Sequence, residues 1–454
     1  MGNAAEFAKI LKTRQPKLWT SLRSAYGHAK ALRRRVFKAW AWIRYVPAPG
    51  SPTQVHLSWA QNPSTSFTVT WHTRSPRNPG LVEYRPVGFA DWQRITGTTK
   101  LVRSIGSAIH RASVAGLRPA TAYEYRLSSD TGAAQAWSDT FTTRTAPPRG
   151  PADFSFAFLC DTGLIGRPDG KCTGTKQIID ELLADRPHLV LGGGDYAYAN
   201  QDPRYKTVAQ AVDAWFVQME PLLTHTPLMA QYGNHEIFLE ERFEDWAFRF
   251  AHPDGFQNSR DFSFDVGDVH FTALFVPGPP PSANRLDWLD SDLAAARERG
   301  MRWLVVFQHV PIFAHGHNHP AKPKVRAALG PLMEKHRVDL HFSGHDQNYE
   351  RTFPLVGLPS RPVPTSAAET TYEAGRGVIY AKVSPAGKLS DVRHGFSRFT
   401  TAQQTFIAVR DDSAHHYCLV KVRAVGELEV NAYSVAGNGS PRVLIDSYRI
   451  LSST

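Results

Sequence analysis

The stretch Leu191-Gly-Gly-Gly-Asp195-Tyr-Ala-Tyr198 organises the interpretation of the whole sequence. It ends the apolar run 188–191, which predicts a strand that enters a glycine turn and then presents a carboxylate and, three residues later, a phenol. Glycines let a backbone turn sharply and approach a ligand closely. A carboxylate can bridge two cations, and a phenolate suits a hard ferric ion. Taken alone, however, the stretch favours an ordinary strand-to-loop turn with a capping aspartate.

Four further apolar runs also end in residues of metal-ligand type. They are Cys160-Asp161-Thr162-Gly163, Gly233-Asn234-His235-Glu236, Val306-Phe-Gln-His309-Val-Pro311 and Gly344-His345-Asp346-Gln347. Open α/β sheets place ligands at the carboxyl ends of their strands. We therefore expect the five strand ends to converge on one site.

Predicted strands and helices alternate from Pro151 onward. The predicted helices cover 176–184, 209–223, 286–299 and 324–336, and the predicted strands or extended segments cover 155–160, 188–191, 227–232, 269–275, 303–307 and 338–342. This alternation is typical of an α/β domain. The runs between 377 and 450 again have the character of strands, and we expect them to form a second sheet that closes over the first.

The region before Pro151 has a different texture. Short alternating runs cover 55–59, 66–71, 81–84, 122–127 and 136–142, with turn-rich segments between them. About seven such strands over roughly 100 residues predict a β-sandwich. The Pro/Arg-rich segment 144–151 is a natural linker to the α/β region.

The net charge of +11 is concentrated at the amino terminus. Residues 1–45 contain eleven lysines and arginines against one acid, Glu6, whereas the remainder of the chain is close to neutral. That remainder lacks the basic stripe interleaved with aromatic residues that nucleic-acid-binding surfaces show. We therefore expect no nucleic-acid partner.

The basic segment 1–46 has two competing interpretations. Apolar residues between Phe7 and Leu22 recur at roughly helical spacing, which favours an arm that contacts anionic membranes. Arg34 and Arg35 open a stretch similar to a twin-arginine export signal, but the apolar run that follows, 39–43, is too short for a signal peptide. No run approaches the ~18 consecutive apolar residues of a membrane-spanning helix, so the sequence leaves localisation, including export, open.

Three cysteines, Cys160, Cys172 and Cys418, are too few for a disulfide framework in this chain. Cys160 and Cys172 would pair only if the loop between them folded back. We expect buried thiols.

The ordered series of motifs resembles the metallophosphoesterase superfamily and, within it, the purple acid phosphatases. That family has the pattern Asp-x-Gly, Gly-Asp-x-x-Tyr, Gly-Asn-His-(Glu/Asp), Val-x-x-His and Gly-His-x-His. The wider superfamily usually has Asp-x-His at the first motif, whereas here position 163 is glycine and Tyr198 appears in the second motif. The resemblance covers about 50–450, because the family also carries an amino-terminal β-sandwich.

The resemblance implies an α/β (α+β) catalytic domain, built as a two-sheet sandwich flanked by helices and preceded by an all-β domain. We accordingly predict a basic arm over 1–46, a fibronectin III-like domain over 47–147 and a metallophosphoesterase catalytic domain over 152–454.

The resemblance also implies a centre of two metal ions. The matching ligands are Asp161, Asp195 and Tyr198 for a ferric ion, and Asn234, His309 and His345 for a divalent zinc, manganese or iron ion. Asp195 would bridge the two. Such a pair binds phosphate oxygens and activates a hydroxide that attacks phosphorus, so no side-chain nucleophile is required. The implied activity is acid-phosphatase-like hydrolysis of small phosphate monoesters.

The histidines near these ligands match the remaining catalytic positions of the family. His235 matches the residue that contacts the phosphate. A proton donor for the leaving group is expected in His315-Gly-His317-Asn-His319, where His319 is the best match and His317 nearly as good. The alternative for this cluster is a solvated polar loop.

The fifth motif departs from the family, because Gln347 stands where the second histidine completes the ferric site. An amide oxygen is a weaker donor than imidazole, although oxygen suits a hard cation. Asp346 is an alternative ligand, but alternate residues of an extended loop point in opposite directions. The sequence therefore leaves open whether this metal site is weaker, differently populated or empty.

Two other functions compete with the phosphomonoesterase. One is a phosphodiesterase or nucleotide phosphatase on the same core. The other is a metal-poor, non-catalytic relative that lost turnover through Gln347.

Overall fold

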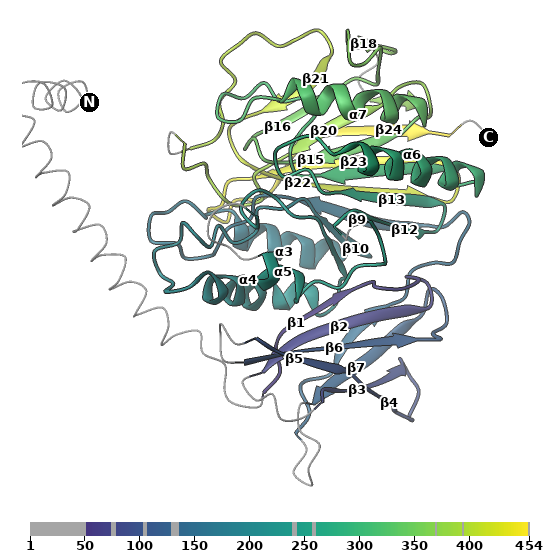
Figure 1. The fold of residues 1–454 in the computed structure, drawn as a ribbon, viewed down its shortest axis with the longest axis vertical. Coiled ribbons are helices and arrows are strands. Elements are labelled where there is room, and N and C mark those ends of the chain that lie inside the picture. Colours follow the sequence, from purple (N-terminus) through teal and green to yellow (C-terminus); the bar gives the residue numbers. More distant parts are fainter. Residues whose placement is uncertain are drawn as a thin grey trace, which may run out of the picture.

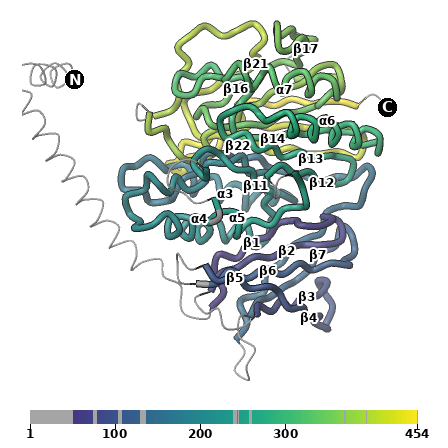
Figure 2. The backbone as a smooth tube through the Cα atoms, in the orientation of Figure 1, coloured from purple at the N-terminus to yellow at the C-terminus, as the bar shows by residue number. Residues whose placement is uncertain are grey.

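The computed structural model describes residues 51–452 except 74–78, 103–106, 129–135, 238–242, 257–259, 368–369 and 393–394. The predicted arm over 1–46 therefore lies outside the described residues. Figure 1 shows a small β-sandwich at one end of the long axis and two larger sheets with flanking helices beyond it. Figure 2 draws the backbone in the same orientation and shows the same order of layers, coloured from the amino to the carboxyl terminus.

The first eight strands form a sandwich of two four-stranded antiparallel sheets, with the orders β1-β2-β6-β5 and β4-β3-β7-β8. The strands are β1 (Thr53–Ser58), β2 (Ser66–Thr73), β3 (Leu81–Pro86), β4 (Gln93–Thr96), β5 (Thr98–Val102), β6 (Ser107–Ala115), β7 (Ala122–Ser128) and β8 (Phe141–Arg144). In β7 the inward-facing Tyr123, Tyr125 and Leu127 are buried, as the alternation predicts, and they share one core with Trp59 and Trp71.

One strand expectation for this region is wrong, and three strands lie in a stretch for which the sequence pattern made no prediction. The segment 93–115 contains β4, β5 and β6, which the pattern does not reveal, because β4 and β5 are mostly exposed and carry no regular apolar alternation. The strand expected over 136–142 begins only at Phe141, after five residues without regular structure.

The remaining chain is organised by two seven-stranded sheets, as the resemblance implies. The first has the order β11-β10-β9-β22-β23-β24-β19. Its strands are β9 (Phe154–Leu159), β10 (Leu189–Gly192), β11 (Leu228–Ala230), β19 (Thr371–Glu373), β22 (His415–Arg423), β23 (Glu427–Val435) and β24 (Val443–Leu451). The strands β9, β10 and β11 are parallel, so their carboxyl ends lie at one edge.

The second sheet has the order β12-β13-β14-β15-β20-β16-β21. Its strands are β12 (Phe262–Val266), β13 (Val269–Leu274), β14 (Trp303–Gln308), β15 (Leu340–Ser343), β16 (Tyr349–Thr352), β20 (Ile379–Val383) and β21 (Ile407–Asp411), and a separate hairpin joins β17 (Leu355–Val356) to β18 (Val363–Pro364). Strands β13, β14, β15 and β20 are parallel. Apolar side chains pack between the two sheets, where the rings of Phe158 and Phe342 stack at 4.9 Å.

The expectation that 377–450 forms a second sheet closing over the first is wrong. The strands β22, β23 and β24 extend the first sheet next to β9, whereas β20 and β21 join the second. The motif-bearing strands are themselves divided between both sheets. A run of apolar residues predicts a strand but does not specify which strand it pairs with.

Helices cover the outer face of each sheet, as Figure 1 shows. They are α3 (Thr175–Asp185), α4 (Val208–Leu223), α5 (Phe243–Ala247), α6 (Ala283–Glu298) and α7 (Pro323–Lys335). The helices α3 and α4 pack on the first sheet, and α6 and α7 pack on the second. All four begin and end within a few residues of the predicted bounds. The amino terminus of α4 is fixed by a capping box between Thr207 and Gln210.

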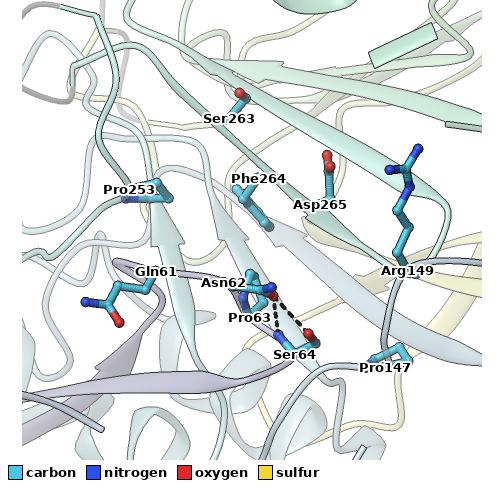
Figure 3. Close-up of a pocket in the computed structure, with 11 residues that line it drawn as sticks. Gln61, Asn62, Pro63, Ser64, Pro147, Arg149, Pro253, Ser263, Phe264 and Asp265 are labelled. Atoms are coloured by element: carbon cyan, nitrogen blue, oxygen red, sulfur yellow. Dashed lines mark hydrogen bonds between the residues drawn. The ribbon is translucent and has the colours of Figure 1, made fainter. Parts of the chain in front are cut away.

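The β-sandwich packs directly against the first sheet and its helices. The Tyr125 hydroxyl donates to the carbonyl of Thr224 at 2.8 Å, and Nε2 of His56 lies 2.8 Å from the carbonyl of Arg249. A cavity of about 380 Å³ lies between the β-sandwich and β12 of the second sheet, and it is lined by Gln61, Asn62, Pro63, Ser64, Pro147, Arg149, Pro253, Ser263, Phe264, Asp265 and Gly267. Figure 3 shows this lining, which contains none of the expected ligands.

Within the described residues, no helix is long and apolar enough to cross a membrane. The three cysteines are buried and unpaired, as expected.

Candidate metal centre

The carboxyl ends of five strands meet at one cleft of about 120 Å³, with β9, β10 and β11 on one side and β14 and β15 on the other. The cleft is lined by Asp195, Tyr198, Gln201, Asn234, His235, His319, His345, Gln347, Ser390, Asp391 and Val392. Asp161 and His309 are fully buried and contact these lining residues. The structure thus brings together the seven residues that the resemblance implies as metal ligands.

Nε2 of His309 lies at the centre of a cluster of ligand-type atoms. It is 3.1 Å from Oδ2 of Asp195, 3.1 Å from Oδ1 of Asn234 and 3.1 Å from Nδ1 of His345. On the opposite side of the ring, Nδ1 of His309 lies 2.9 Å from the carbonyl of Gly193, to which it donates. That hydrogen bond fixes the ring so that Nε2 faces the cluster, as in other metal-binding histidines.

In the metal-free chain, a proton on His309 balances the charge of this cluster. Burial alone would lower the pKa of His309, but the Asp195 carboxylate raises it to about 9. Burial alone would raise the pKa of Asp195, and the neighbouring His309 lowers it below its usual range. Burial lowers the pKa of His345 well below 6.5. A metal ion bound here would therefore displace the proton of His309.

Asp161, Tyr198 and Gln347 form a second group of donors, all of them oxygens. The Tyr198 hydroxyl donates to Oδ1 of Asp161 at 2.6 Å and accepts from Nε2 of Gln347 at 3.0 Å. Oδ2 of Asp161 accepts from the backbone N–H of His345 at 3.0 Å and from the Ser384 hydroxyl at 2.8 Å. Burial, together with the charge of Asp161, raises the pKa of Tyr198, so a phenolate forms here only when a cation replaces the proton.

The residues present fit a pair of metal ions. Oε1 of Gln347 is buried and has no hydrogen-bond partner within the described part of the chain. Asp195 and Asn234 both place an oxygen near Nε2 of His309, so this cluster gathers three atoms that can act as metal ligands. One group supplies only oxygen and the other supplies imidazole nitrogen as well, which suits two cations of different character.

Strained backbone marks the same residues. Eight non-glycine residues in the described chain have positive φ angles, and four of them are candidate ligands: Asp161 (61°), Asp195 (54°), Tyr198 (48°) and His345 (70°). Such conformations are rare outside glycine and cluster at functional sites. The strain turns these side chains from the strand ends into the cleft.

Glu236 is a buried residue at the site to which the sequence assigns no role. Its carboxylate accepts the backbone N–H groups of Asp195 at 2.8 Å, Tyr196 at 2.9 Å and Gly233 at 2.7 Å. Burial raises the pKa of Glu236 to about 7, and the charge of Asp195 acts in the same direction. Glu236 therefore clamps the second and third motifs together, and its place in Gly-Asn-His-Glu is the only sequence signal for it.

Asp346 is turned away from the cluster. Both of its carboxylate oxygens accept other hydrogen bonds, including one from the buried Nζ of Lys382 at 2.7 Å. The opposite directions of Asp346 and Gln347 follow the alternation of an extended segment. The alternative in which Asp346 replaces the missing histidine ligand is therefore wrong for this structure.

The structure separates the histidines of the 315–319 loop. His319 lines the cleft, and its ring lies 4.4 Å from the ring of His345. His317 is not among the residues that line the cleft. Nδ1 of His315 lies 2.9 Å from Oε1 of Glu350, and His315 is not among the residues that line the cleft either. Of the two proton donors that the resemblance leaves open, only His319 faces the site.

His235 lines the cleft beside the second group of donors. Its ring lies 4.2 Å from the ring of Tyr198, and Nδ1 is 3.2 Å from Oδ1 of Asn200. Its backbone N–H donates to Oδ1 of Asp195 at 2.8 Å. Burial lowers the pKa of His235, so the ring is neutral near pH 7 in the metal-free chain.

One wall of the cleft comes from a segment that the sequence does not single out. Ser390, Asp391 and Val392 line the cleft. Asp391 is held by Lys388 at 3.2 Å and by Lys171. Nothing in the strand-like pattern of 377–450 indicates this loop.

The comparisons with known proteins agree with this geometry. A family model for the purple acid phosphatase N-terminal domain matches residues 52–145, and one for calcineurin-like phosphoesterases matches residues 154–349. Purple acid phosphatase 23 of Arabidopsis thaliana is 28% identical over 67% of this chain and 73% of its own length. Acid phosphatase type 7 of Mus musculus is 26% identical over 74% of this chain and 78% of its own length.

A solved purple acid phosphatase from yellow lupin has the same fold. It aligns with a TM-score of 0.77 over 89% of this chain and 75% of its own chain, at 18% identity. The chain belongs to the metallophosphoesterase superfamily, in which it is purple acid phosphatase-like. That membership places it in a phosphatase family of metallophosphoesterases, which implies a dinuclear metal centre.

Proposed function

We propose that this chain hydrolyses phosphate monoesters at a site that holds two metal ions, one ferric and one divalent. The observation that carries the proposal is that Asp195 contacts one donor group, while its charge also acts on Tyr198 in the other. Its Oδ2 is 3.1 Å from Nε2 of His309, and both Asp195 and Tyr198 line the same cleft. A carboxylate between two cations offsets their mutual repulsion.

The two donor groups would each hold one ion. Asp161, Tyr198 and Gln347, with Asp195, would hold the ferric ion, and Asn234, His309 and His345, again with Asp195, would hold zinc, manganese or iron. Bound ions would polarise the phosphate and lower the pKa of a bound water. The hard oxygen donors suit the ferric ion, and the imidazole-rich group suits the divalent one.

The protein's own contribution is to orient these donors. The Gly193 carbonyl holds the ring of His309, and Glu236 holds the backbone of Asp195 through a 2.8 Å hydrogen bond. Because both supports are buried, the donors lose little further freedom when a metal ion binds.

His235 and His319 would act on the ester itself. Both line the cleft, and no candidate nucleophile among serines, threonines or cysteines is required for the reaction. His235 would donate a hydrogen bond to the phosphate. His319 would give a proton to the leaving alkoxide, a contribution of ~10²–10⁴-fold in rate.

One observation favours the competing, metal-poor function. Tyr198 donates to Asp161 and accepts from Gln347, so its hydroxyl is satisfied without a metal ion. Gln347 supplies no charge and a weaker donor than the histidine it replaces. The ferric site is therefore the weaker half of the proposed centre.

Metal analysis and an aryl-phosphate assay on the same purified sample test the proposal. We expect bound iron and a divalent metal, and turnover that disappears with a chelator and returns with the metals. Hydrolysis of a diester at a higher rate than the monoester would favour the phosphodiesterase, and a metal-free chain without turnover would favour the non-catalytic relative.

A further inference from the structure

The loop that carries His319 is anchored to the fifth motif by the carboxylate of Asp346. Oδ2 of Asp346 accepts the backbone N–H of Gly316 at 3.1 Å, and Oδ1 accepts the backbone N–H of His319 at 3.3 Å. Oδ1 also accepts the Ser397 hydroxyl, whose oxygen in turn accepts the backbone N–H of Asn318 at 3.0 Å. Three backbone N–H groups of the loop are therefore held by the Asp346 carboxylate and its partner Ser397.

The close approach of the loop requires a glycine at position 316. A Cβ atom there would lie 2.4 Å from Oδ2 of Asp346 and 2.6 Å from the hydroxyl oxygen of Ser397. Such distances are far shorter than van der Waals contact, so any side chain would push the loop away from the carboxylate.

The charge of Asp346 is balanced by Lys382. Their side chains are 0% and 1% exposed, and Nζ of Lys382 lies 2.7 Å from Oδ2 of Asp346. Buried ion pairs are costly to desolvate and contribute little net stability. Positioning, rather than stability, is thus the physical effect that this pair supplies beside the cleft.

The buried pair of Asp346 and Lys382 lies next to the candidate metal centre, because Asp346 stands between two candidate ligands in the sequence. His345 and Gln347, its two neighbours, line the cleft, while Asp346 points away from it towards the loop. The ring of His319 rests 4.4 Å from the ring of His345. One short segment therefore presents two candidate ligands on one side and holds the candidate proton donor from the other.

We propose that Asp346, paired with Lys382, is a positioning residue that sets His319 over the metal centre. This inference rests on the proposed function, because it assigns His319 the protonation of the leaving group. Loss of Asp346 should release the loop at Gly316 and His319 and leave the candidate ligands in place. The resulting loss of turnover should be larger for a leaving group that needs more protonation.

A series of leaving groups tests the inference. Removal of Asp346 alone would leave Lys382 buried without a partner, so the double variant Asp346→Ala, Lys382→Met is compared with Ser397→Ala and His319→Ala. p-Nitrophenyl phosphate, whose leaving group needs little protonation, and an alkyl phosphate, whose leaving group needs much, are the two substrates. Metal content is measured on every sample, and Asp446→Asn, which neutralises one member of the buried pair with Arg351, is the control for the loss of a buried ion pair.

We expect the double variant to lose roughly 10²-fold in kcat on the alkyl phosphate and only a few-fold on p-nitrophenyl phosphate, with metal content unchanged. Ser397→Ala should show the same pattern more weakly, and Asp446→Asn should show no dependence on the leaving group. Adding His319→Ala to the double variant should cause little further loss of kcat, because both changes remove the same protonation of the leaving group.

Equal losses on both substrates, a parallel loss of metal, or additive effects with His319→Ala would overturn the inference while leaving the proposed function intact. A wild-type chain that hydrolyses neither substrate with metals bound would instead contradict the proposed function, and the inference with it.

Discussion

Nε2 of His309 and Oδ2 of Asp195 lie 3.1 Å apart, although Asp195 follows β10 in the first sheet and His309 follows β14 in the second. The candidate metal centre therefore lies on the seam between the two sheets. Neither sheet carries the full set of donors. A metal ion held by both should oppose the separation of the sheets.

Metal binding should accordingly stabilise the fold. A ligand that binds only the folded state at one hundred times its dissociation constant adds about 2.7 kcal/mol to the free energy of unfolding. We expect the thermal midpoint to rise on addition of zinc or manganese and to fall with a chelator. Asp195→Asn is the control and should lose most of the shift. An unchanged midpoint in the wild-type chain would argue against metal binding at the seam.

Gln347→His should strengthen the weaker half of the centre. Imidazole is a stronger donor than an amide oxygen, so the variant should hold more metal per chain than the wild type, which should purify with less than two. If iron is bound, the Tyr198 phenolate should give a visible charge-transfer band that intensifies in the variant. Elemental analysis and absorbance spectra check both. Two tightly held metals in the wild type, unaffected by the substitution, would mean that Gln347 is already a competent ligand.

His341 should make the protein sensitive to acid. Its ring is fully buried on β15, neither nitrogen has a hydrogen-bond partner among the other described residues, and burial lowers its pKa from 6.5 to about 3. The pKa of His341 is lower in the folded state than in the unfolded state. The free energy of unfolding is therefore at its full value above pH 6.5, and it falls as the pH drops towards 3, by up to about 1.4 kcal/mol per pH unit.

His341→Phe should therefore gain about 2 kcal/mol relative to the wild type between pH 7 and pH 5, measured by urea unfolding. His270 is the matched control. Burial alone would lower its pKa, but Asp265 and Asp292 raise it to about 9, so its contribution is complete below pH 6.5 and is lost as the pH rises through 9. A His341→Phe difference that does not vary with pH would refute the assignment.

The basic arm should be dispensable for chemistry. Deleting residues 1–45 removes eleven lysines and arginines and one acid, so it should weaken binding to anionic lipid vesicles by roughly 1 kcal/mol for each basic residue that contacts the surface. Turnover of a small phosphate ester should not change. Vesicle sedimentation at low and high salt checks the prediction, and equal binding of both chains would end the membrane interpretation.

The site was largely predictable because each donor follows a buried strand within a few residues. Asp161, Asp195 and His309 stand within three residues of the ends of such strands, and the carboxyl ends of parallel strands share an edge. The division of these strands between two sheets was not predictable from the apolar runs alone, because pairing partners leave no local signal.

The parts that the sequence missed depend on contacts between distant segments. Ser384 reaches Asp161, and Asp391 forms part of the cleft wall, but each lies in a stretch that carries only strand-like alternation. Alternation does correctly predict that Asp346 and Gln347 point in opposite directions. What Asp346 contacts on its own side became evident only from the packing of the 315–319 loop.

The most direct test of the account is the metal content and aryl-phosphate turnover of the wild type, Asp195→Asn and His319→Ala, each measured on one purified sample. A neutral amide cannot supply the charge that a bridging carboxylate gives to both ions, so Asp195→Asn should lose metal and nearly all turnover. His319→Ala should keep its metal and lose far less aryl-phosphate turnover, because an aryl leaving group needs little protonation; the ~10²–10⁴-fold loss is expected on an alkyl phosphate. Near-normal turnover or unchanged metal content in Asp195→Asn would contradict the account.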